Sequence, residues 1–544
     1  MADEASGERE RVRTVEVVAT LSLATDLSIG VPLEHGLHSA LIARRLCDEV
    51  HADQQEATEA FYAALLFYIG CTGTALTASG IFGEDDALTT YATAVRFDRP
   101  RRQVAGMARA VAPPGHPRYR RAIQLARGLP RLARALPTVV ATDCDVAQML
   151  MDRLGLTPGV AALFAHTNDR WDGKRPPGRP RGEAIPLPMR IAQVARDAAF
   201  QRMLGGDEFA ARVIRSRAGA AFDPAIAAAY GRRSNDIFAG DPTASVWSQI
   251  PASEPGPGLV LEGAAIDDAL AAMGDFADLL SPFLLGHSAG VAELAVTAGR
   301  QCGLDETELR ALGRAALVHD LGRVTVPARV WQIAGPLSPG DWESVRLHAY
   351  HTERILSRSS FLRRLARTAA LHHERLDGSG YHRGCSAPEI PVPARILAAA
   401  DCYHTMTESR ADRDAFPPDQ AVETVVADAR AGRLDAEAVA AVVEAAGHKR
   451  PQLGRPAGLT TRERTVVGPP GPGAADQADR QGSRGLGQDC RHPYSARVPE
   501  DGCVDEGWRG SVRHAPRHRG LRRTPDTAAG LILLASLHMA KEVV

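Results

Sequence analysis

Five histidines and two aspartates in the middle of the chain carry the groups that a divalent metal centre needs. They are His287, His319, Asp320, His348, His372, His373 and Asp401. Imidazole and carboxylate ligands suit the cations of hydrolytic sites, and a two-metal site needs a carboxylate that bridges both ions. Each histidine alone fits an ordinary core residue, but burying all seven groups without a cation would carry a large desolvation cost. The set therefore predicts a metal-dependent hydrolase.

Helices are the elements that must position these groups. Leu309, Leu312 and Ala316 follow the i, i+3, i+7 spacing of a buried helical stripe, which runs directly into His319 and Asp320. Other predicted ligands also stand three, four or seven residues from apolar neighbours. We therefore expect the ligands to face the interior of a helical domain.

The order of these residues resembles a known family. The pattern H…HD…H…HHExxDGxGY…D, with HHERLDGSGY at 372–381, resembles the HD-GYP subgroup of the HD phosphohydrolase superfamily over residues 263–450. The resemblance implies two iron or manganese ions and hydrolysis of a cyclic dinucleotide such as cyclic di-GMP. The implied ligands are His287, His319 and Asp401 for one ion and His348, His372 and His373 for the other, with Asp320 bridging both.

The resemblance also implies residues that act on the substrate. Arg323 stands where the family usually has a lysine, so the catalytic and phosphate-binding cation is kept. Its planar guanidinium replaces the compact ammonium group of lysine. Asp377, Gly380 and Tyr381 are expected to shape a substrate-binding loop, because Asp-Gly favours turns and glycine permits positive φ. An ordinary turn explains Asp377-Gly378 and Gly380 equally well.

Two departures from the family narrow what the resemblance implies. His382 replaces the proline of the GYP tripeptide, which removes a fixed φ and leaves the specificity for cyclic di-GMP open. Phe283 stands where some members have a glutamate ligand for a third metal. We therefore expect two ions rather than three.

The composition favours a mostly α fold. Hydrophobic residues make up 44% of the chain and aromatic residues only 5%, and long stretches rich in Ala, Leu, Arg and Glu favour helices. At 544 residues the chain is too long for one ordinary core. The net charge is -1, so any binding to nucleic acid or anionic lipid must be local.

Residues 236–262 concentrate Pro, Gly, Ser and Asp and predict a linker that holds no helix between two helical blocks, 15–235 and 263–450. The blocks repeat the same landmarks in order, which predicts tandem all-α HD-type domains. The landmark pairs are His38 with His287, Phe67-Tyr68 with His319-Asp320, Thr167-Asn168 with His372-His373, and Arg196 with Asp401. We interpret the first block as a degenerate repeat without metal ligands that serves as a scaffold, a sensor or a dimerisation unit.

Residues 451–544 predict a different kind of segment. GLTTRER, at 458–464, resembles the opening of a LuxR-type helix-turn-helix domain, but the Pro- and Gly-rich sequence that follows cannot form the rest of that domain. A reading frame shifted by one nucleotide would encode two sequence segments typical of that domain. We therefore expect a frameshift near 464–468 and a disordered tail. The DNA binding expected of such a regulator would then be lost.

The remaining features point to the cytoplasm. The eight cysteines include no CxxC pair, the N-terminus lacks the apolar run of a signal peptide, and the apolar run 531–535 is too short to cross a membrane. The leading hypothesis is a metal-dependent phosphodiesterase, with a homodimer left open. The alternative is a nucleotide-sensing transcriptional regulator whose HD domains bind without turnover.

Overall fold

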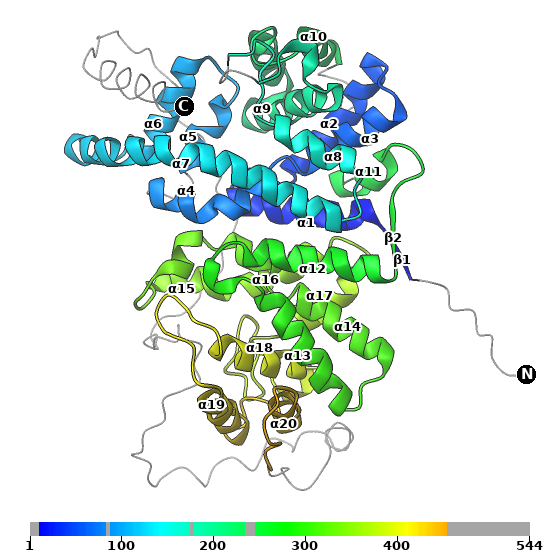
Figure 1. The fold of residues 1–544 in the computed structure, drawn as a ribbon, viewed down its shortest axis with the longest axis vertical. Helices are drawn as coiled ribbons and strands as arrows, with labels where there is room; N and C mark the ends of the chain where they lie inside the picture. Colours follow the sequence, from blue (N-terminus) through cyan, green and yellow to red (C-terminus); the bar gives the residue numbers. More distant parts are fainter. Residues whose placement is uncertain (1–9, 83–86, 175–178, 234–244, 454–544) are drawn as a thin grey trace, which may run out of the picture.

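The computed structural model describes residues 10–82, 87–174, 179–233 and 245–453. Within these ranges the chain is mostly α, as predicted, and its helices form two blocks that lie one above the other in Figure 1. The predicted helix-turn-helix remnant and tail, from residue 454 onward, lie outside the described residues.

The first block contains eleven α-helices among the described residues. They are α1 (Thr14–Ile29), α2 (His35–Val50), α3 (Gln54–Leu65), α4 (Ala75–Ile81), α5 (Ala87–Tyr91), α6 (Pro100–Val111), α7 (Arg118–Arg153), α8 (Pro158–Leu163), α9 (Leu187–Arg217), α10 (Pro224–Arg233) and α11 (Val246–Ser253). Short 3-10 turns join them: η1 (Ile69–Thr74), η2 (Thr93–Val95), η3 (Phe164–His166) and η4 (Gly182–Ala184).

The second block repeats this style of short helices and 3-10 turns. Its α-helices are α12 (Ala264–Asp278), α13 (His287–Gln301), α14 (Glu306–Leu317), α15 (Pro339–Arg346), α16 (His348–Leu356), α17 (Arg363–Ala370), α18 (Val392–Met406), α19 (Pro418–Arg430) and α20 (Ala436–Ala445). Its 3-10 turns are η5 (Pro282–Leu284), η6 (Leu321–Thr325), η7 (Ala328–Gln332) and η8 (Ala387–Glu389).

A short antiparallel sheet and a shared core hold the two blocks together. β1 (Arg11–Arg13) pairs with β2 (Val260–Glu262). One hydrophobic core includes buried residues of α1, α2 and α9 as well as of α12, η6 and α17. Glu16 of α1 accepts hydrogen bonds from Ser359 (2.8 Å) and Ser360 (3.2 Å) of the second block. The blocks are therefore packed against each other rather than only tethered.

The predicted linker contains regular structure. Val246–Ser253 forms α11, where the Ser245 side chain accepts from the Ser248 N–H (3.2 Å) and Ile250 is buried. A serine cap and one buried side chain stabilise this helix despite Pro251. The expectation that residues 236–262 hold no helix was wrong for this part.

A hydrogen bond at the start of α2 recurs at the start of α13. The Gly36 N–H donates to Asp26 of α1 (3.2 Å), and the Ser288 N–H donates to Asp278 of α12 (2.9 Å). In both blocks the donor is the second residue of its helix, and the next helix, α3 or α14, begins with an aspartate capping box. The two blocks thus share the same local chain path here.

This contact changes one of the predicted landmark pairs. His35 is the first residue of α2, as His287 is the first residue of α13. The pairing of His38 with His287 was therefore wrong by about one helical turn. Both segments contain the tripeptide HSA, and aligning the two blocks on it gave the wrong register.

A close backbone approach supplies a further pair. A Cβ atom on Gly70 of η1 would lie 1.9 Å from the Asp143 carbonyl oxygen, and one on Gly322 of η6 would lie 2.0 Å from the His348 carbonyl oxygen. Asp143 in α7 therefore stands where His348 stands in the second block. The helices α4 to α6 and the first half of α7 come between Gly70 and Asp143, an insertion that the sequence comparison did not reveal.

One stretch of the described chain has the length and apolar composition of a membrane-crossing helix. It runs from Gln54 to Ile81, and 72% of its most apolar window is buried inside the fold. It comprises α3, η1 and α4 and contributes to the main core. Burial of this degree is typical of a core element.

Candidate metal centre

Five segments of the second block bring the seven predicted ligands together. His287 begins α13 and His348 begins α16, whereas His319-Asp320 and His372-His373 directly follow α14 and α17, and Asp401 lies in α18. Each of the seven side chains is at most 1% exposed. Helix ends thus direct polar groups into one dry interior.

Asp320 lies at the centre of the cluster, with one carboxylate oxygen on each side. Its Oδ2 is 3.3 Å from His287 Nε2 and 2.9 Å from His319 Nε2. Its Oδ1 is 3.3 Å from His348 Nε2 and 3.4 Å from His372 Nε2. Such a carboxylate has the geometry to bridge two cations.

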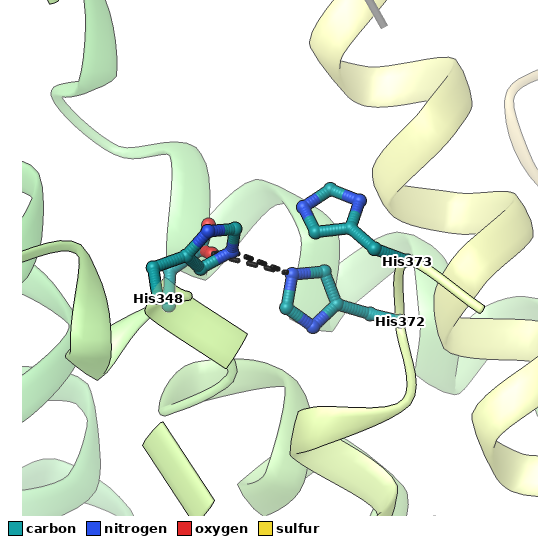
Figure 2. Close-up of side chains that lie close together, drawn as sticks. His348, His372 and His373 are labelled. Carbon is teal, nitrogen blue, oxygen red and sulfur yellow. Dashed lines mark hydrogen bonds and ion pairs between the residues drawn. The ribbon is translucent and has the colours of Figure 1, made fainter. Parts of the chain in front are cut away.

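Two groups of four potential ligands share Asp320. One is His287, His319, Asp320 and Asp401, and the other is Asp320, His348, His372 and His373. In each group the ligand atoms lie within 4.8 Å of one another. Figure 2 shows the three histidines of the second group turned toward one another. This is the grouping that the family resemblance implies.

The electrostatics of the centre suit a cation. Burial opposes ionisation of Asp320, but Arg323 and His319 beside it hold the pKa of this carboxyl well below its usual range. Burial also opposes protonation of His287 and His319, yet the neighbouring carboxylates raise the pKa of His287 to about 10 and that of His319 to about 9. Both Asp320 oxygens face imidazole nitrogens, and Arg323 is the nearest permanent cation. A buried carboxylate surrounded in this way is suited to binding a cation.

Hydrogen bonds to the main chain fix the orientation of three of the histidines. His319 Nδ1 lies 2.6 Å from the Ala316 carbonyl oxygen, and His348 and His372 make the same contact with the carbonyl three residues before them. Each Nδ1 must carry a proton to donate to a carbonyl, so Nε2 is the nitrogen that faces the centre and that can ligate a metal once it is deprotonated. His287 differs, since its Nδ1 lies 2.9 Å from Glu408 Oε2.

Arg323, the predicted phosphate-binding cation, lies at the edge of the centre. It is 2% exposed, its NH2 is 2.7 Å from Asp320 Oδ2, and its guanidinium lies over the Trp331 ring at 5.5 Å. Its Nε and NH1 make no hydrogen bond within the described ranges. Guanidinium donors without a partner are of the kind that binds phosphoryl oxygens.

The residues of the predicted substrate loop have two different positions: some form a turn, and Tyr381 packs on the ligand cluster. The Asp377 carboxylate accepts from the Ser379 N–H (3.0 Å) and hydroxyl (2.6 Å), so it stabilises the turn and does not reach the centre. Gly380 admits no side chain, because a Cβ would lie 2.4 Å from the Arg375 nitrogen. The Tyr381 ring stacks on His373 at 4.7 Å. Tyr381 is therefore the loop residue that meets the metal-ligand cluster.

Sequence reasoning missed two side chains that support the centre. Glu408 contacts His287, and the Thr352 hydroxyl accepts from the Gly322 N–H (2.8 Å) while donating to the His319 carbonyl (3.0 Å). Glu408 stands two helical turns after Asp401, a spacing that would have suggested a common face. Thr352 carries no sequence signal, since a lone threonine in a helix is common.

Comparison with known proteins agrees with this geometry. Residues 272–438 match the family model described as an HD domain. The second block is an HD domain. Its solved relatives include a cyclic GMP-AMP specific phosphodiesterase of Vibrio cholerae, with a TM-score of 0.54 and 24% identity over 80% of this chain and 98% of that one. At this identity the likeness shows the fold, which extends over both helical blocks.

Curated relatives of the HD domain are phosphodiesterases by name. The 3′3′-cGAMP-specific phosphodiesterase 3 of Vibrio cholerae is 29% identical over 424 residues, which is 75% of this chain and 89% of the relative. The cyclic di-GMP phosphodiesterase of Thermotoga maritima is 34% identical over 141 residues, 26% of this chain and 38% of the relative. Such shorter matches span well under half of their relatives. The chain is thus a phosphodiesterase of the metal-dependent HD type.

Proposed function

We propose that the chain hydrolyses a 3′3′-linked cyclic dinucleotide at a two-metal centre held by the seven ligands in their two groups. The observation that carries this is the bridging position of Asp320, with one oxygen facing each set of histidines. Two iron or manganese ions at this centre would supply an activated hydroxide for in-line attack on phosphorus. Water is added across one phosphodiester bond, so the cyclic substrate opens to a linear dinucleotide.

The residues around the ligands would have separate tasks. Arg323 would bind a phosphoryl oxygen through the donors that Asp320 leaves available. Tyr381 would exclude water on the His373 side and offer its ring to a base, while Gly380 lets the loop lie close to Glu374. Asp377 would act through the turn that it stabilises.

The choice between two cyclic dinucleotides rests on the relatives. The relative that aligns over 89% of its length is named for 3′3′-cGAMP, whereas relatives that align over about two fifths of theirs are named for cyclic di-GMP. We therefore place 3′3′-cGAMP first among the substrates. This extends the expectation from the sequence, which named cyclic di-GMP.

The test is hydrolysis of both dinucleotides by the purified full chain loaded with Mn²⁺ or Fe²⁺, followed by chromatography of the linear products. His319→Ala should abolish turnover, whereas His116→Ala, in the first block, should not. No turnover of either dinucleotide by a chain shown to contain two metal ions would contradict the proposal.

We further propose that the first block is a degenerate HD-type repeat with a sensing or scaffolding role. Arg196, fully buried in α9, stands where Asp401 stands in the second block, with its guanidinium 4.7 Å from the Tyr68 ring centroid. Burial lowers the pKa of Arg196 only to about 10, so it stays charged. A fixed organic cation and aromatic rings thus take the place of metal and ligands, which favours binding without turnover here. Dinucleotide binding by a metal-free His319→Ala chain would support this second role.

A further inference from the structure

The described surface carries one strongly charged feature that the HD chemistry does not use. Residues 99–142 contain ten arginines and no aspartate, glutamate or lysine, whereas the whole chain has 65 acidic residues in 544. This stretch has a formal charge of +10 in a chain of net charge -1. It belongs to the insertion that separates Gly70 from Asp143 and has no counterpart in the second block.

The insertion has its own small core. Phe82, Ala87 and Val111 are buried together, and Leu125, Leu129 and Leu132 of α7 pack against this cluster. These three leucines of α7 are therefore turned inward. Figure 1 shows the N-terminal half of α7 reaching past the helices of the second block.

The outer side of the same helix is lined by arginines. Arg120, Arg127, Arg131 and Arg134 are exposed at the spacing of one helical face, and we call them the arginine face. Among the described residues none of the four has an ion-pair partner. Tyr119, 62% exposed, directly precedes Arg120, whose guanidinium lies over its ring.

We propose that the arginine face binds the phosphate backbone of a nucleic-acid duplex without regard to sequence. Guanidinium forks match phosphate oxygens, and an aromatic ring among them is common on nucleic-acid surfaces. The four arginines extend over about 21 Å of helix, a length along which B-DNA presents more than about ten phosphates. An anionic membrane is the competing partner, because an interfacial helix needs apolar side chains toward the lipid and Ile123 and Leu136 of α7 are exposed. The vesicle measurement below distinguishes the two.

The test is fluorescence anisotropy of a labelled random-sequence duplex titrated with the full chain at several salt concentrations. The variant is Arg127→Gln, Arg131→Gln and Arg134→Gln together, which removes three exposed charges. The control is Arg310→Gln, Arg354→Gln and Arg430→Gln, three exposed arginines of the second block. We expect the slope of log affinity against log salt to fall by about 2 to 3 in the variant and to stay unchanged in the control.

Three results would overturn this proposal. They are no binding to the duplex at low salt, equal losses in the variant and the control, and tighter binding to phosphatidylglycerol vesicles or polyglutamate than to the duplex. The variant should keep the wild-type melting temperature, since its three side chains are exposed. Dinucleotide hydrolysis is a separate measurement and does not bear on the result.

A second inference concerns His287 and rests on the proposed metal centre. Three other histidines of the centre are oriented by a carbonyl three residues before them, but the left-handed Gly286 turns the chain between η5 and α13, and the Nδ1 of His287 contacts a side chain instead. A carboxylate fills this role: Glu408 Oε2 lies 2.9 Å from His287 Nδ1. Glu408 is itself held by Arg410 (2.8 Å) and lies 3.2 Å from His404 Nδ1.

The geometry points to Glu408 as a positioning residue that strengthens one of the two metal sites. A carboxylate partner makes an imidazole a better donor to a metal than a carbonyl partner does. The site of His287, His319 and Asp401 should therefore bind its ion more tightly than the site of His348, His372 and His373. Arg410 also donates to the Phe283 carbonyl oxygen (2.8 Å), which fixes the loop before α13.

The test is Mn²⁺ binding to the full chain without substrate, measured by metal analysis and by competition with a chelator. Glu408→Ala should weaken one site by about 10- to 100-fold and leave the other unchanged, and Glu408→Gln should restore part of the loss. Glu444→Gln, at an exposed ion pair with Arg450, is the control. Two sites of unchanged affinity in Glu408→Ala would overturn this inference alone, whereas a wild-type chain that binds no metal would overturn the proposed function with it.

Discussion

The metal-free centre holds protons where it would otherwise hold cations. The carboxylates around His287 and His319 overcome burial and raise the pKa of the two imidazoles to about 10 and about 9. Both rings are thus protonated at neutral pH in the metal-free protein. Metal binding must displace these protons, because a ligating imidazole is neutral.

The stability of the metal-free chain should therefore fall as pH rises from about 6.5 to about 8.5. A histidine whose pKa is raised by folding stabilises the fold fully below its unfolded pKa of 6.5 and loses that contribution as pH rises toward the folded value. The expected loss is on the order of 1 kcal/mol per histidine and pH unit. Thermal unfolding in a chelator would measure it.

Metal affinity should change with pH in the opposite direction over the same window. Mn²⁺ competes with protons at His287 and His319, so its affinity should rise with pH. The variant His319→Gln should show a shallower slope in both experiments. A metal-free unfolding midpoint that stays flat or rises with pH would show that these rings are not protonated.

Arg196 makes a prediction for the first block. Its Nε and both terminal nitrogens make no hydrogen bond among the described residues, and its ion-pair partner Asp197 is also held by Arg217. Arg196→Met should change stability by less than about 1 kcal/mol, because an apolar side chain of similar length replaces a poorly paired buried charge. Arg196→Ala should cost about 2 to 5 kcal/mol through the cavity it leaves. Urea unfolding of both variants compares them, and a greater loss with Met than with Ala would contradict this view.

The sequence predicted which residues meet at the centre but not what orients them. The ligand types are rare in a core, so their order carried the signal. Glu408 and Thr352 act through hydrogen bonds to residues far away in the sequence, so only coordinates reveal them. His35 was missed for another reason, because a shared tripeptide three residues later masked the true register.

At the scale of elements, the centre depends on how closely η6 approaches α16. Gly322→Ala would place a methyl group 2.0 Å from the His348 carbonyl oxygen and 2.5 Å from the Thr352 nitrogen, both main-chain atoms that cannot rotate away. We expect a loss of about 3 kcal/mol and of bound metal. Gly340→Ala is the control, since a Cβ there meets nothing within 4 Å. Metal analysis and thermal unfolding of the two variants would decide, and a metal-replete Gly322→Ala chain would contradict the prediction.

Periodic apolar residues predicted the helices around the centre, and the structure confirms a mostly α fold. The insertion of α4 to α6 and the first half of α7 escaped notice because its helices follow the same periodicity as their neighbours. The helix α11 escaped because its proline and serines are typical of a linker, while its cap and the burial of Ile250 depend on the rest of the fold. Local sequence therefore predicts whether a segment is helical better than it predicts where that helix lies in the fold.

At the scale of the whole molecule, the first block supports the metal centre of the second. α1 packs against η6, the turn that directly follows His319-Asp320, and buried residues of both belong to one core. Arg153 of α7 forms an ion pair with Asp275 of α12. Without the first block, η6 would expose Leu321 and Val324 to water.

We therefore expect that residues 245–453 produced alone will aggregate or bind little metal. Co-expression with residues 1–244 should restore a complex with the metal content of the intact chain, because the shared core and the β1–β2 pair can form between two chains. Size-exclusion chromatography with metal analysis would follow both preparations. A monomeric, metal-replete second block would show instead that the HD domain folds on its own and that the first block contributes only what it binds.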